Sequence, residues 1–387
     1  MIGAFTFNTS QRLVFEEGSS AALAQHAASF LGARPLIVTD KGIVSSGLLA
    51  GPLKSLSGDG RDLAVFDGIT ADPDLGVLNG ALEAARTFKP TAIVGFGGGS
   101  SLDVSKLVAL LASSSEPLDG IWGVGNIKGP RLPLILVPTT AGTGSEVTPI
   151  SIITISEDEK RGAVSPVLLP DLAVLDPLLT IGLPAPTTAA TGVDAMVHAI
   201  ESFTSRSPNN NPVSRTLAVE ALKLLGQHIE SAVTRPEDRA ARGGMLLGSM
   251  LAGMAFANSP VAAVHALAYP IGSSFHVPHG VSTALMLPHV IRFNAEEAQT
   301  GYAELAPHVF PELSSVSKPL ERTNLFADRL QDLIKRLGLA PSLRDAGITA
   351  SDLQKMAADA MKQTRLLVNN PRPVTETNAL AIYEAAL

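Results

Sequence analysis

Four side chains of this sequence have the types and the spacing of a metal site. Asp194 and His198 stand four residues apart in TGVDAMVHAIES, so a helix carries both side chains on one face. His265 follows in the apolar stretch VAAVHALAYP, and His279 follows in HVPHG. One carboxylate and three imidazoles suit a borderline divalent ion such as Fe²⁺ or Zn²⁺. Because such a metal can act as a Lewis acid on a substrate oxygen, the set predicts a metalloenzyme.

Each of these residues alone has a simpler interpretation. A single histidine in an apolar helix, such as His265, is more often a buried core residue than a ligand. The combination of the helical pair with the HVPHG loop favours a metal site. Two neighbouring histidines are interpreted differently: His276 is predicted to support the ligands and His289 to be structural.

A glycine-rich turn, GFGGGSSLDVSK (95–106), is predicted between a strand and a helix. Without Cβ atoms, Gly97, Gly98 and Gly99 let backbone amides approach a phosphate closely. Ser100 is predicted as the helix N-cap with Asp103 as its capping-box partner, and the helix start suits a pyrophosphate. The spacing is not G-x-G-x-x-G, so it does not predict an ordinary Rossmann fingerprint. The alternative is a tight turn before a well-capped helix.

Two further polar features follow predicted strands. The loop PTTAGTGSEVT (138–148) offers five hydroxyls that can bind a nucleotide, or that belong to a polar surface turn. Asp40 ends the first clear strand, where a carboxylate can accept a hydrogen bond from a ribose hydroxyl and repel a 2′-phosphate. A lone aspartate at this position can also be a simple turn former.

The elements that position these residues change type along the chain. Buried strands are predicted at 35–40, 62–69, 91–99 and 133–140, with helices at 75–88 and 101–113 between them. This alternation predicts a doubly wound α/β domain over residues 1–181. Residues 182–387 predict an all-helical domain that contains the whole metal set. A cleft between the two is the expected ligand site. The helices predicted in the second half span residues 212–233, 237–258, 324–339 and 350–363.

Composition limits the classes of partner. The chain has 387 residues, of which 45% are hydrophobic and 17% charged, and a formal net charge of −7. Without Lys/Arg runs, this charge argues against a nucleic-acid or membrane partner. There are no cysteines, so His and carboxylates must hold any metal. The N-terminus has no signal-peptide pattern, and the apolar region at 244–275 predicts core helices; a cytoplasmic location is expected.

Four motifs together resemble the iron-containing alcohol dehydrogenase family: GGGSSLDVSK, PTTAGTGSEVT, GVDAMVHAIE and VHALAYPIGSSFHVPHG occur in that family's order and spacing. The resemblance runs from FTFNTSQRLVFEEGS to NNPRPVT (369–375). It implies a dehydroquinate synthase-like fold, with an N-terminal dinucleotide-binding domain and a C-terminal helical domain.

The resemblance also implies roles for individual residues. The family's one Asp and three His ligands fall on the four residues named above, and its pyrophosphate loop falls on Gly97–Ser100. An acid at Asp40 implies NAD rather than NADP. A basic nucleotide contact falls on Lys160 or Arg161. The remaining cofactor contacts are expected from residues of the second loop and the domain junction, namely Thr139, Thr140, Thr143, Thr148 and Leu179.

One position departs from the family pattern. Several members carry a second histidine one turn after the third ligand, in a role of proton transfer, and this chain has Tyr269 there. A phenol is a poorer general base than imidazole at neutral pH. A proton is then expected to leave through the ribose hydroxyl, water or His276.

The predicted activity is reversible hydride transfer between NAD(H) and a small primary alcohol or its aldehyde. Four protein ligands fill a tetrahedral zinc shell, whereas Fe²⁺ accepts five or six, so iron leaves room for substrate and Zn²⁺ remains the second choice. The alternatives are a maleylacetate reductase-like enzyme, a hydroxyacid–oxoacid transhydrogenase and a 3-dehydroquinate synthase-like lyase. The complete ligand set argues against the first, and the absence of a Lys/Arg cluster argues against the last. A homodimer or a higher homo-oligomer is expected from relatives.

Overall fold

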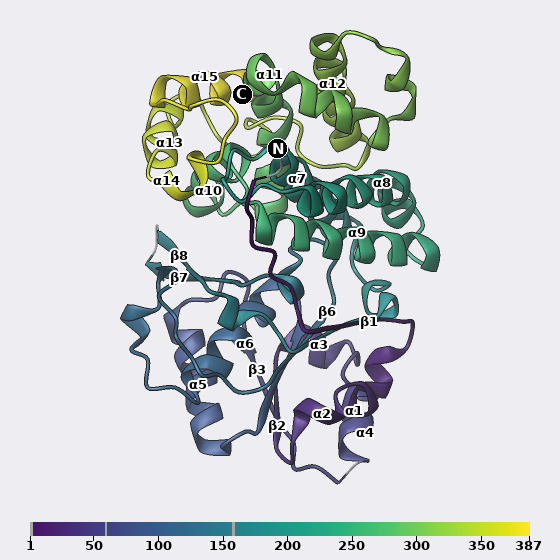
Figure 1. The fold of residues 1–387 in the computed structure, drawn as a ribbon, viewed down its shortest axis with the longest axis vertical. Coiled ribbons are helices and arrows are strands. Elements are labelled where there is room, and N and C mark those ends of the chain that lie inside the picture. Colours follow the sequence, from purple (N-terminus) through teal and green to yellow (C-terminus); the bar gives the residue numbers. More distant parts are fainter. Residues whose placement is uncertain (1–2, 59, 157–158) are drawn as a thin grey trace. The chain divides into compact units, whose positions relative to one another are not determined.

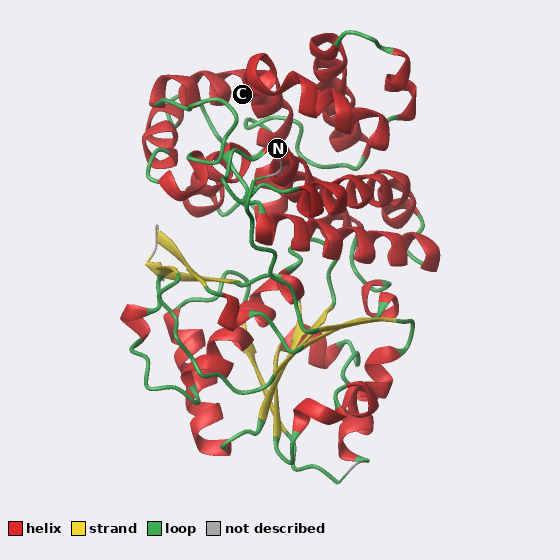
Figure 2. Cartoon of the chain, viewed as in Figure 1, coloured by secondary structure: helices red, strands yellow, loops and turns green. Residues whose placement is uncertain are grey.

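Strands and helices segregate along the chain in this computed structural model, which describes residues 3–58, 60–156 and 159–387 (Figures 1 and 2). One compact unit comprises Asn8–Gly182, and the other comprises Leu183–Leu387 with the N-terminal segment that ends at Phe7. Within the described ranges, all strands lie in the first unit. The predicted fold class, α/β followed by all-α, is confirmed. The predicted domain limits differ from this division by one residue at the boundary and in the placement of the N-terminal segment.

The main sheet of the α/β unit is parallel throughout and has the strand order β1–β9–β6–β4–β2–β3. Its central strands are buried on both faces, as their continuous apolar runs predict. The edge strand β1 and its neighbour β9 were not predicted. The six strands are β1 (Arg12–Phe15), β2 (Pro35–Asp40), β3 (Ala64–Ile69), β4 (Ala92–Gly97), β6 (Leu134–Pro138) and β9 (Leu172–Leu175).

Helices cover both faces of this sheet. Along β2, Leu36 and Val38 pack into the core beneath α5 (Leu75–Phe88) and α6 (Gly99–Leu111), whereas Ile37 packs into the opposite core. The alternation follows from the strand period of two. Trp122 is partly buried against the α5/α6 core. The opposite core is covered by α1 (Leu23–His26), α2 (Ala28–Leu31) and α4 (Ala50–Ser57), and α3 (Lys41–Ser45) follows β2.

The direction of the chain through the sheet reverses between β2 and β4. From β2 the chain adds β3 on one side, and it then returns to add β4, β6 and β9 on the other side. Asp40 ends β2 and Gly97 ends β4. In open parallel sheets, ligands bind beyond the carboxyl ends of the strands at such a reversal.

A second sheet of the α/β unit has the order β5–β8–β7 and was not predicted. Its strands are β5 (Gly123–Val124), β7 (Ile150–Ser156) and β8 (Glu159–Val164), with β7 and β8 antiparallel. Short 3₁₀ helices complete the chain: η1 (Ser19–Ala22), η2 (Leu118–Gly120), η3 (Ser145–Val147), η4 (Pro166–Leu168), η5 (Pro177–Thr180) and η6 (Pro311–Ser315).

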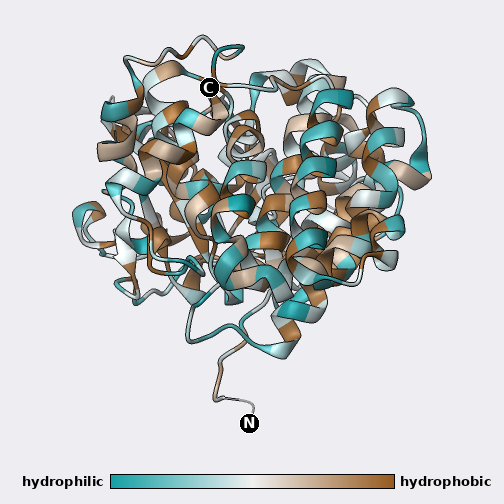
Figure 3. Ribbon diagram, turned by 90° about the horizontal axis from the view of Figure 1, so that it is seen from above, coloured by the Kyte–Doolittle hydropathy of each residue, from teal (hydrophilic) through white to brown (hydrophobic). Residues whose placement is uncertain are grey.

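The helical unit is organised around one buried helix, α7, which packs against α8, α9 and α11. Seen from above, apolar and polar residues alternate along its helices (Figure 3). The predicted helices at 212–233, 237–258, 324–339 and 350–363 correspond to α8, α9, α12 and α13. The unit comprises α7 (Ala185–Thr204), α8 (Pro212–Thr234), α9 (Arg239–Asn258), α10 (Ala263–Phe275), α11 (His279–Val309), α12 (Pro319–Arg336), α13 (Leu353–Ala360), α14 (Thr364–Leu367) and α15 (Glu376–Ala386).

Helix α9 is long and apolar enough to cross a membrane by length and composition, and no other helix among the described residues meets that test. Its most apolar window is 67% buried inside the unit. Burial of this kind is typical of a core helix, as the sequence predicted for this region.

Candidate metal centre and dinucleotide site

Three helices of the helical unit bring the four predicted ligands together. Helix α7 carries Asp194 and His198, α10 carries His265, and α11 begins at His279. The Nε2 atoms of His198, His265 and His279 lie 3.9, 3.9 and 3.6 Å from carboxylate oxygens of Asp194. The ligand atoms of Asp194, His198 and His265 all lie within 4.8 Å of one another. His279 lies beside this group through its contact with Asp194.

A close approach between α7 and α11 explains the glycine that follows the last histidine of the HVPHG motif. A Cβ on Gly280 would lie 2.3 Å from the backbone oxygen of Ala190. Only glycine lets α11 start against α7 at this point. Ala190 lies one turn before Asp194 in α7, so this contact brings the first residue of α11, His279, beside the carboxylate.

Aromatic packing orients two of the imidazoles. The His198 ring is stacked between Phe256 and His265, with ring centroids 4.3 and 4.8 Å apart and interplanar angles of 20° and 24°. All three side chains are buried, whereas the side chain of His279 is 39% exposed. The group is thus closed on one side and accessible beside His279.

Two further side chains, both missed at the sequence level, bind the predicted ligands. The Glu201 carboxylate lies 2.6 Å from Nδ1 of His265 and also accepts a hydrogen bond of 2.6 Å from the Val264 amide. The Thr283 hydroxyl donates to Asp194 over 3.0 Å. Glu201 had a signal in the sequence: it follows His198 by three residues and is an acid in an otherwise apolar stretch.

The charges of the group stabilise one another. Burial would raise the pKa of Asp194, but the three neighbouring imidazoles and the Thr283 hydroxyl together lower it. Burial would lower the pKa of His265, but the hydrogen bond and the charge of Glu201 raise it, with help from Asp194. Nε2 of His265 is nevertheless buried without a hydrogen-bond partner. A buried imidazole nitrogen without a partner, facing a carboxylate, fits a position intended for a cation.

Two further residues of the predicted catalytic set, Tyr269 and His276, lie in α10 and at its C-terminus. The Tyr269 ring in α10 lies 6.0 Å from the His279 ring, centroid to centroid. His276 is exposed and caps the C-terminus of α10 in the left-handed conformation, with φ of 54°. Burial lowers the pKa of His289, in α11, to about 4. That pKa fits the structural role predicted for His289.

The glycine loop of the α/β unit begins α6 without a side-chain cap. The predicted N-cap at Ser100 is wrong, because α6 starts at Gly99 and the extended residue Gly98 is the N-cap. The predicted capping box is wrong too, because the Asp103 carboxylate accepts instead from the Ser145 hydroxyl and the Ile152 amide, at 2.6 and 2.9 Å. Gly98 has no side chain that could accept from these amides, and the Asp103 carboxylate is held by other donors. The first amides of α6 therefore have no side-chain capping partner.

The two predicted cofactor loops lie side by side. The Thr139 amide donates to the Gly97 oxygen over 3.0 Å. Added Cβ atoms on Gly98 and Gly99 would lie 3.4 Å from the Thr140 methyl and 2.8 Å from the Thr143 methyl. Gly97 has φ of 145°, which favours glycine. The loops therefore meet through backbone and small side chains.

A buried lysine, also missed at the sequence level, holds these loops together. Lys106 in α6 donates from Nζ to the Ser145 hydroxyl, the Thr148 hydroxyl and the Ile150 carbonyl, at 2.7, 3.2 and 2.6 Å. Its Nζ lies 3.5 Å from the Asp103 carboxylate. Burial lowers the pKa of this lysine. In the motif GGGSSLDVSK the glycines indicate a turn, whereas no spacing marks this lysine as a contact of the second loop.

The remaining predicted cofactor residues, Asp40, Lys160 and Leu179, each contact other residues of the α/β unit. Asp40 is the N-cap of α3, accepts from the Ile43 amide, and has Oδ2 3.4 Å from where a Cβ on Gly97 would lie. Lys160 pairs with Asp72 at 2.5 Å, and Leu179 is buried in the core on the α1/α2/α4 side of the sheet. Asp40 therefore joins the glycine loop, and Lys160 and Leu179 do not show a contact with it.

Two family models cover nearly all of the chain. Residues 10–177 match the model for iron-containing alcohol dehydrogenase, and residues 188–387 match the model for the C-terminal part of the Fe-containing alcohol dehydrogenase family. The chain belongs to the iron-containing alcohol dehydrogenase family. A long-chain-alcohol dehydrogenase from Geobacillus thermodenitrificans is 38% identical over 360 residues, or 92% of this chain and 90% of the relative. A sulfoacetaldehyde reductase from Bilophila wadsworthia is 34% identical over 384 residues, 99% of each chain.

Solved structures of this alcohol dehydrogenase family have the same fold. A 1,3-propanediol oxidoreductase superposes with a TM-score of 0.95 at 33% identity, covering 99% of this chain and 100% of that one. A sulfoacetaldehyde reductase from Bifidobacterium kashiwanohense, solved in complex with NAD⁺, gives 0.87 at 28% identity, covering 100% and 99%. The predicted family, fold class, enzyme class and type of reaction are confirmed, and NAD and iron agree with the family. The roles of the individual residues stay predictions.

Proposed function

We propose that Asp194, His198, His265 and His279 hold one divalent metal ion, Fe²⁺ in preference to Zn²⁺. The observation that carries this proposal is the convergence of three imidazole Nε2 atoms within 3.9 Å of one carboxylate. The unpartnered Nε2 of His265 supports it, because a buried nitrogen of this kind needs a cation or a donor. When bound, the ion supplies a Lewis acid for the oxygen of an alcohol or aldehyde.

The residues around the ion have complementary tasks. Asp194 brings the one negative charge among the ligands, and Thr283 fixes its orientation. Phe256 excludes water from one side of the His198 ring. The half-exposed His279 leaves the other side open to substrate.

We propose that the glycine loop and the loop of residues 138–148 bind NAD(H). The uncapped amides at the start of α6 suit a pyrophosphate, and Thr140 and Thr143 offer hydroxyls beside them. Asp40 stands at the carboxyl end of β2, where the strand order reverses, beside Gly97. A carboxylate there accepts from a ribose hydroxyl and repels a 2′-phosphate, which favours NAD over NADP.

The reaction proposed for this pair of sites is reversible hydride transfer between NAD(H) and a small primary alcohol or its aldehyde. The named relatives act on alcohols or aldehydes that differ in length and charge. Tyr269, near His279, is proposed to contact the substrate region, with the proton leaving through water, the ribose hydroxyl or His276.

The assembly proposed is a homodimer, with a cytoplasmic location. Within the described residues, β1 pairs only with β9 and forms an edge of the main sheet, and Leu13 and Phe15 on it are 37% and 43% exposed. Apolar side chains along an open strand edge favour pairing with another chain. Light scattering on the wild type and on Phe15→Asp tests this: a monomeric wild type would contradict it.

A metal-replacement experiment tests the activity. The protein is purified without oxygen, stripped of metal and reloaded with Fe²⁺ or Zn²⁺, and NADH is followed with a panel of small alcohols and aldehydes. We expect Fe²⁺ to restore turnover of the wild type but not of His265→Ala. Turnover that persists without metal would overturn the proposal. Hydride exchange between a hydroxy acid and an oxo acid without release of nucleotide would instead indicate a transhydrogenase.

A further inference from the structure

We propose that Glu201 is a positioning residue that fixes the tautomer of His265 and so prepares the metal site. This inference rests on the proposed function, since it assigns the reason why one of the proposed ligands faces the ion with a bare nitrogen. Glu201 is not a ligand in the proposal, because its carboxylate is engaged by two other donors.

Each oxygen of the Glu201 carboxylate contacts a different group of α10. Oε2 lies 2.6 Å from Nδ1 of His265, and Oε1 accepts from the Val264 amide over 2.6 Å. If both oxygens of the carboxylate accept, Nδ1 of His265 is the donor of the second bond and carries a proton. The other ring nitrogen, Nε2, is then left as an acceptor in the neutral ring.

Nε2 of His265 is the atom that points to the proposed ion. It is buried, has no hydrogen-bond partner and lies 3.9 Å from Asp194. A bare nitrogen facing a carboxylate across 3.9 Å makes no hydrogen bond, so without a cation the arrangement has no compensating interaction. In the neutral ring, Glu201 therefore selects the tautomer of His265 whose Nε2 can bind a metal.

The position of the two residues makes this constraint rigid. Glu201 and Asp194 lie on the same buried helix, α7, and Val264 and His265 are adjacent at the start of α10. One carboxylate thus ties the first turn of α10 to α7 through a backbone amide and through the ring. Glu201 is 4% exposed, so water does not replace either bond.

The substitution Glu201→Gln keeps the size of the side chain and changes only which hydrogen bonds it can make. Glutamine offers one acceptor and one donor group. If its oxygen accepts from Val264, its amide must donate to Nδ1 of His265, which moves the ring proton to Nε2. We expect Zn²⁺ and Fe²⁺ affinity to fall about 10- to 100-fold, as for other partners of metal-bound histidines.

The direct readout is the tautomer of His265 in metal-free protein with ¹⁵N-labelled histidine, recorded at alkaline pH where the ring is neutral. The ring signal is assigned by its loss in His265→Ala. We expect the Nδ1–H form in the wild type and a shift toward Nε2–H in Glu201→Gln. Ser202→Ala is the matched control, because it removes a buried hydroxyl that bonds only within α7, and should leave tautomer and affinity unchanged.

The second readout is metal affinity in a double-mutant cycle. In a His265→Ala background, Glu201→Gln should weaken Zn²⁺ binding no further, because its effect passes through that ring. If Glu201→Gln does not fold, Glu201→Asp tests the affinity alone: its shorter side chain cannot reach both donors, so Zn²⁺ should bind more weakly. Unchanged tautomer and unchanged Zn²⁺ affinity in the folded variant would overturn the inference. A wild type that binds no stoichiometric metal but keeps the Nδ1–H tautomer would contradict the proposed function instead.

Discussion

The metal centre of the helical unit and the glycine loop of the α/β unit place polar groups by different means. In the helical unit, ionisable side chains from three buried helices converge, and Glu201 and Thr283 orient them. In the α/β unit, backbone amides and small hydroxyl side chains form the surface, and Lys106 holds it from below. The first arrangement depends on the identity of a few side chains. The second depends on glycines that expose backbone amides beside small hydroxyl side chains.

Removing the carboxylate of the metal centre gives the largest expected effect. We expect Asp194→Ala to lose metal and to reduce kcat/KM by about 10³-fold or more, because the Lewis acid contributes several kcal/mol to the transition state. Metal content by mass spectrometry and steady-state kinetics measure this. NADH affinity should hold if the two sites are independent, and Asp328→Ala, which breaks an exposed ion pair with Arg292, serves as the control. Full metal content in Asp194→Ala would contradict the assignment.

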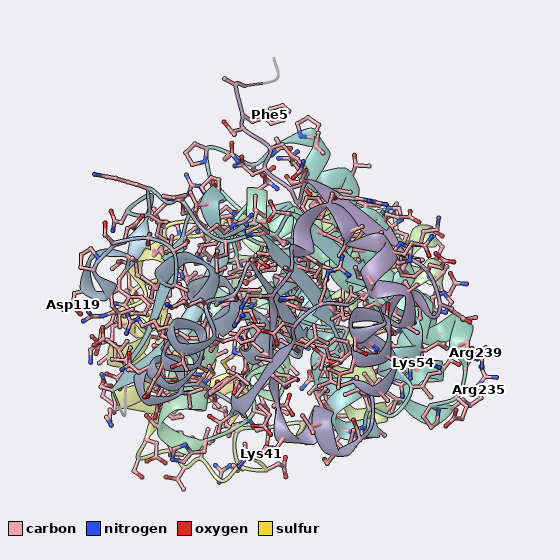
Figure 4. All side chains as sticks on the ribbon, turned by 90° about the horizontal axis from the view of Figure 1, so that it is seen from below. Phe5, Lys41, Lys54, Asp119, Arg235 and Arg239 are labelled. Carbon is pink, nitrogen blue, oxygen red and sulfur yellow. The ribbon has the colours of Figure 1, made fainter. Side chains whose placement is uncertain are left out.

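Removing the lysine beneath the glycine loop gives the next effect. We expect Lys106→Met to destabilise the α/β unit by about 3–5 kcal/mol, because it leaves buried acceptors and the Asp103 charge without their partner. Thermal unfolding and NADH titration measure this, with metal content expected to remain. Lys54→Met, at an exposed residue of α4 (Figure 4), is the matched control. Equal stability of the two variants would show that Lys106 does not hold the loops.

Adding one methyl group to the glycine loop tests whether the α/β site needs a position without a side chain. In Gly99→Ala the new Cβ would lie 2.8 Å from the Thr143 methyl, so the loops must separate. Overpacking of this kind disfavours the bound geometry by about 1–3 kcal/mol, and NADH should bind roughly 5- to 150-fold more weakly. Gly80→Ala in α5 is the control: its Cβ would make ordinary 3.7 Å contacts with the Phe66 ring of β3, so it should be neutral or slightly stabilising. Unaltered NADH binding in Gly99→Ala would remove this loop from the cofactor site.

The last effect is a dependence of stability on pH, and it concerns a buried acid in the loop at 138–148. Burial raises the pKa of Glu146 from 4.5 to about 7, and its Oε1 has no hydrogen-bond partner. The folded state therefore keeps a proton that the unfolded chain has lost, so this stabilisation is full below pH 4.5 and disappears as pH rises through 7. The loss amounts to about 3 kcal/mol. The melting temperature of Glu146→Gln relative to wild type should rise between pH 5 and pH 8, and a constant difference would contradict this.

The sequence predicted the main elements because their patterns are periodic. Helix α5 has the predicted bounds, 75–88, and β2 has the predicted bounds, 35–40. The strands β1 and β5 were missed because they are short and partly exposed, so no long apolar run marks them. The strand β7 is longer, but serine and threonine interrupt its apolar residues. The start of α6 was misplaced because the capping rule favours serine, whereas the helix begins at Gly99 with Gly98 as its N-cap.

Of the candidate site, the sequence predicted the metal ligands and the glycine loop but not the residues that hold them in place. A ligand pair four residues apart is visible on a helix, but the partner of His265 is not, because Glu201 meets it from another helix. Lys106 was overlooked for a similar reason. Its three acceptors lie 39–44 residues away, and only the fold brings them to it. The spacing of residues in the sequence predicts which side chains share one helix, whereas contacts between two elements are visible only in the structure.

The single tryptophan of the chain makes the two units separately observable. Trp122 packs against the α5/α6 core of the α/β unit, so its emission follows that unit alone. Far-ultraviolet dichroism, in contrast, follows mainly the helical unit, where most helical residues lie. Two optical signals recorded in the same melt therefore report whether the units lose structure together or in turn, without any label. Non-coincident curves would rule out a single cooperative transition for this chain.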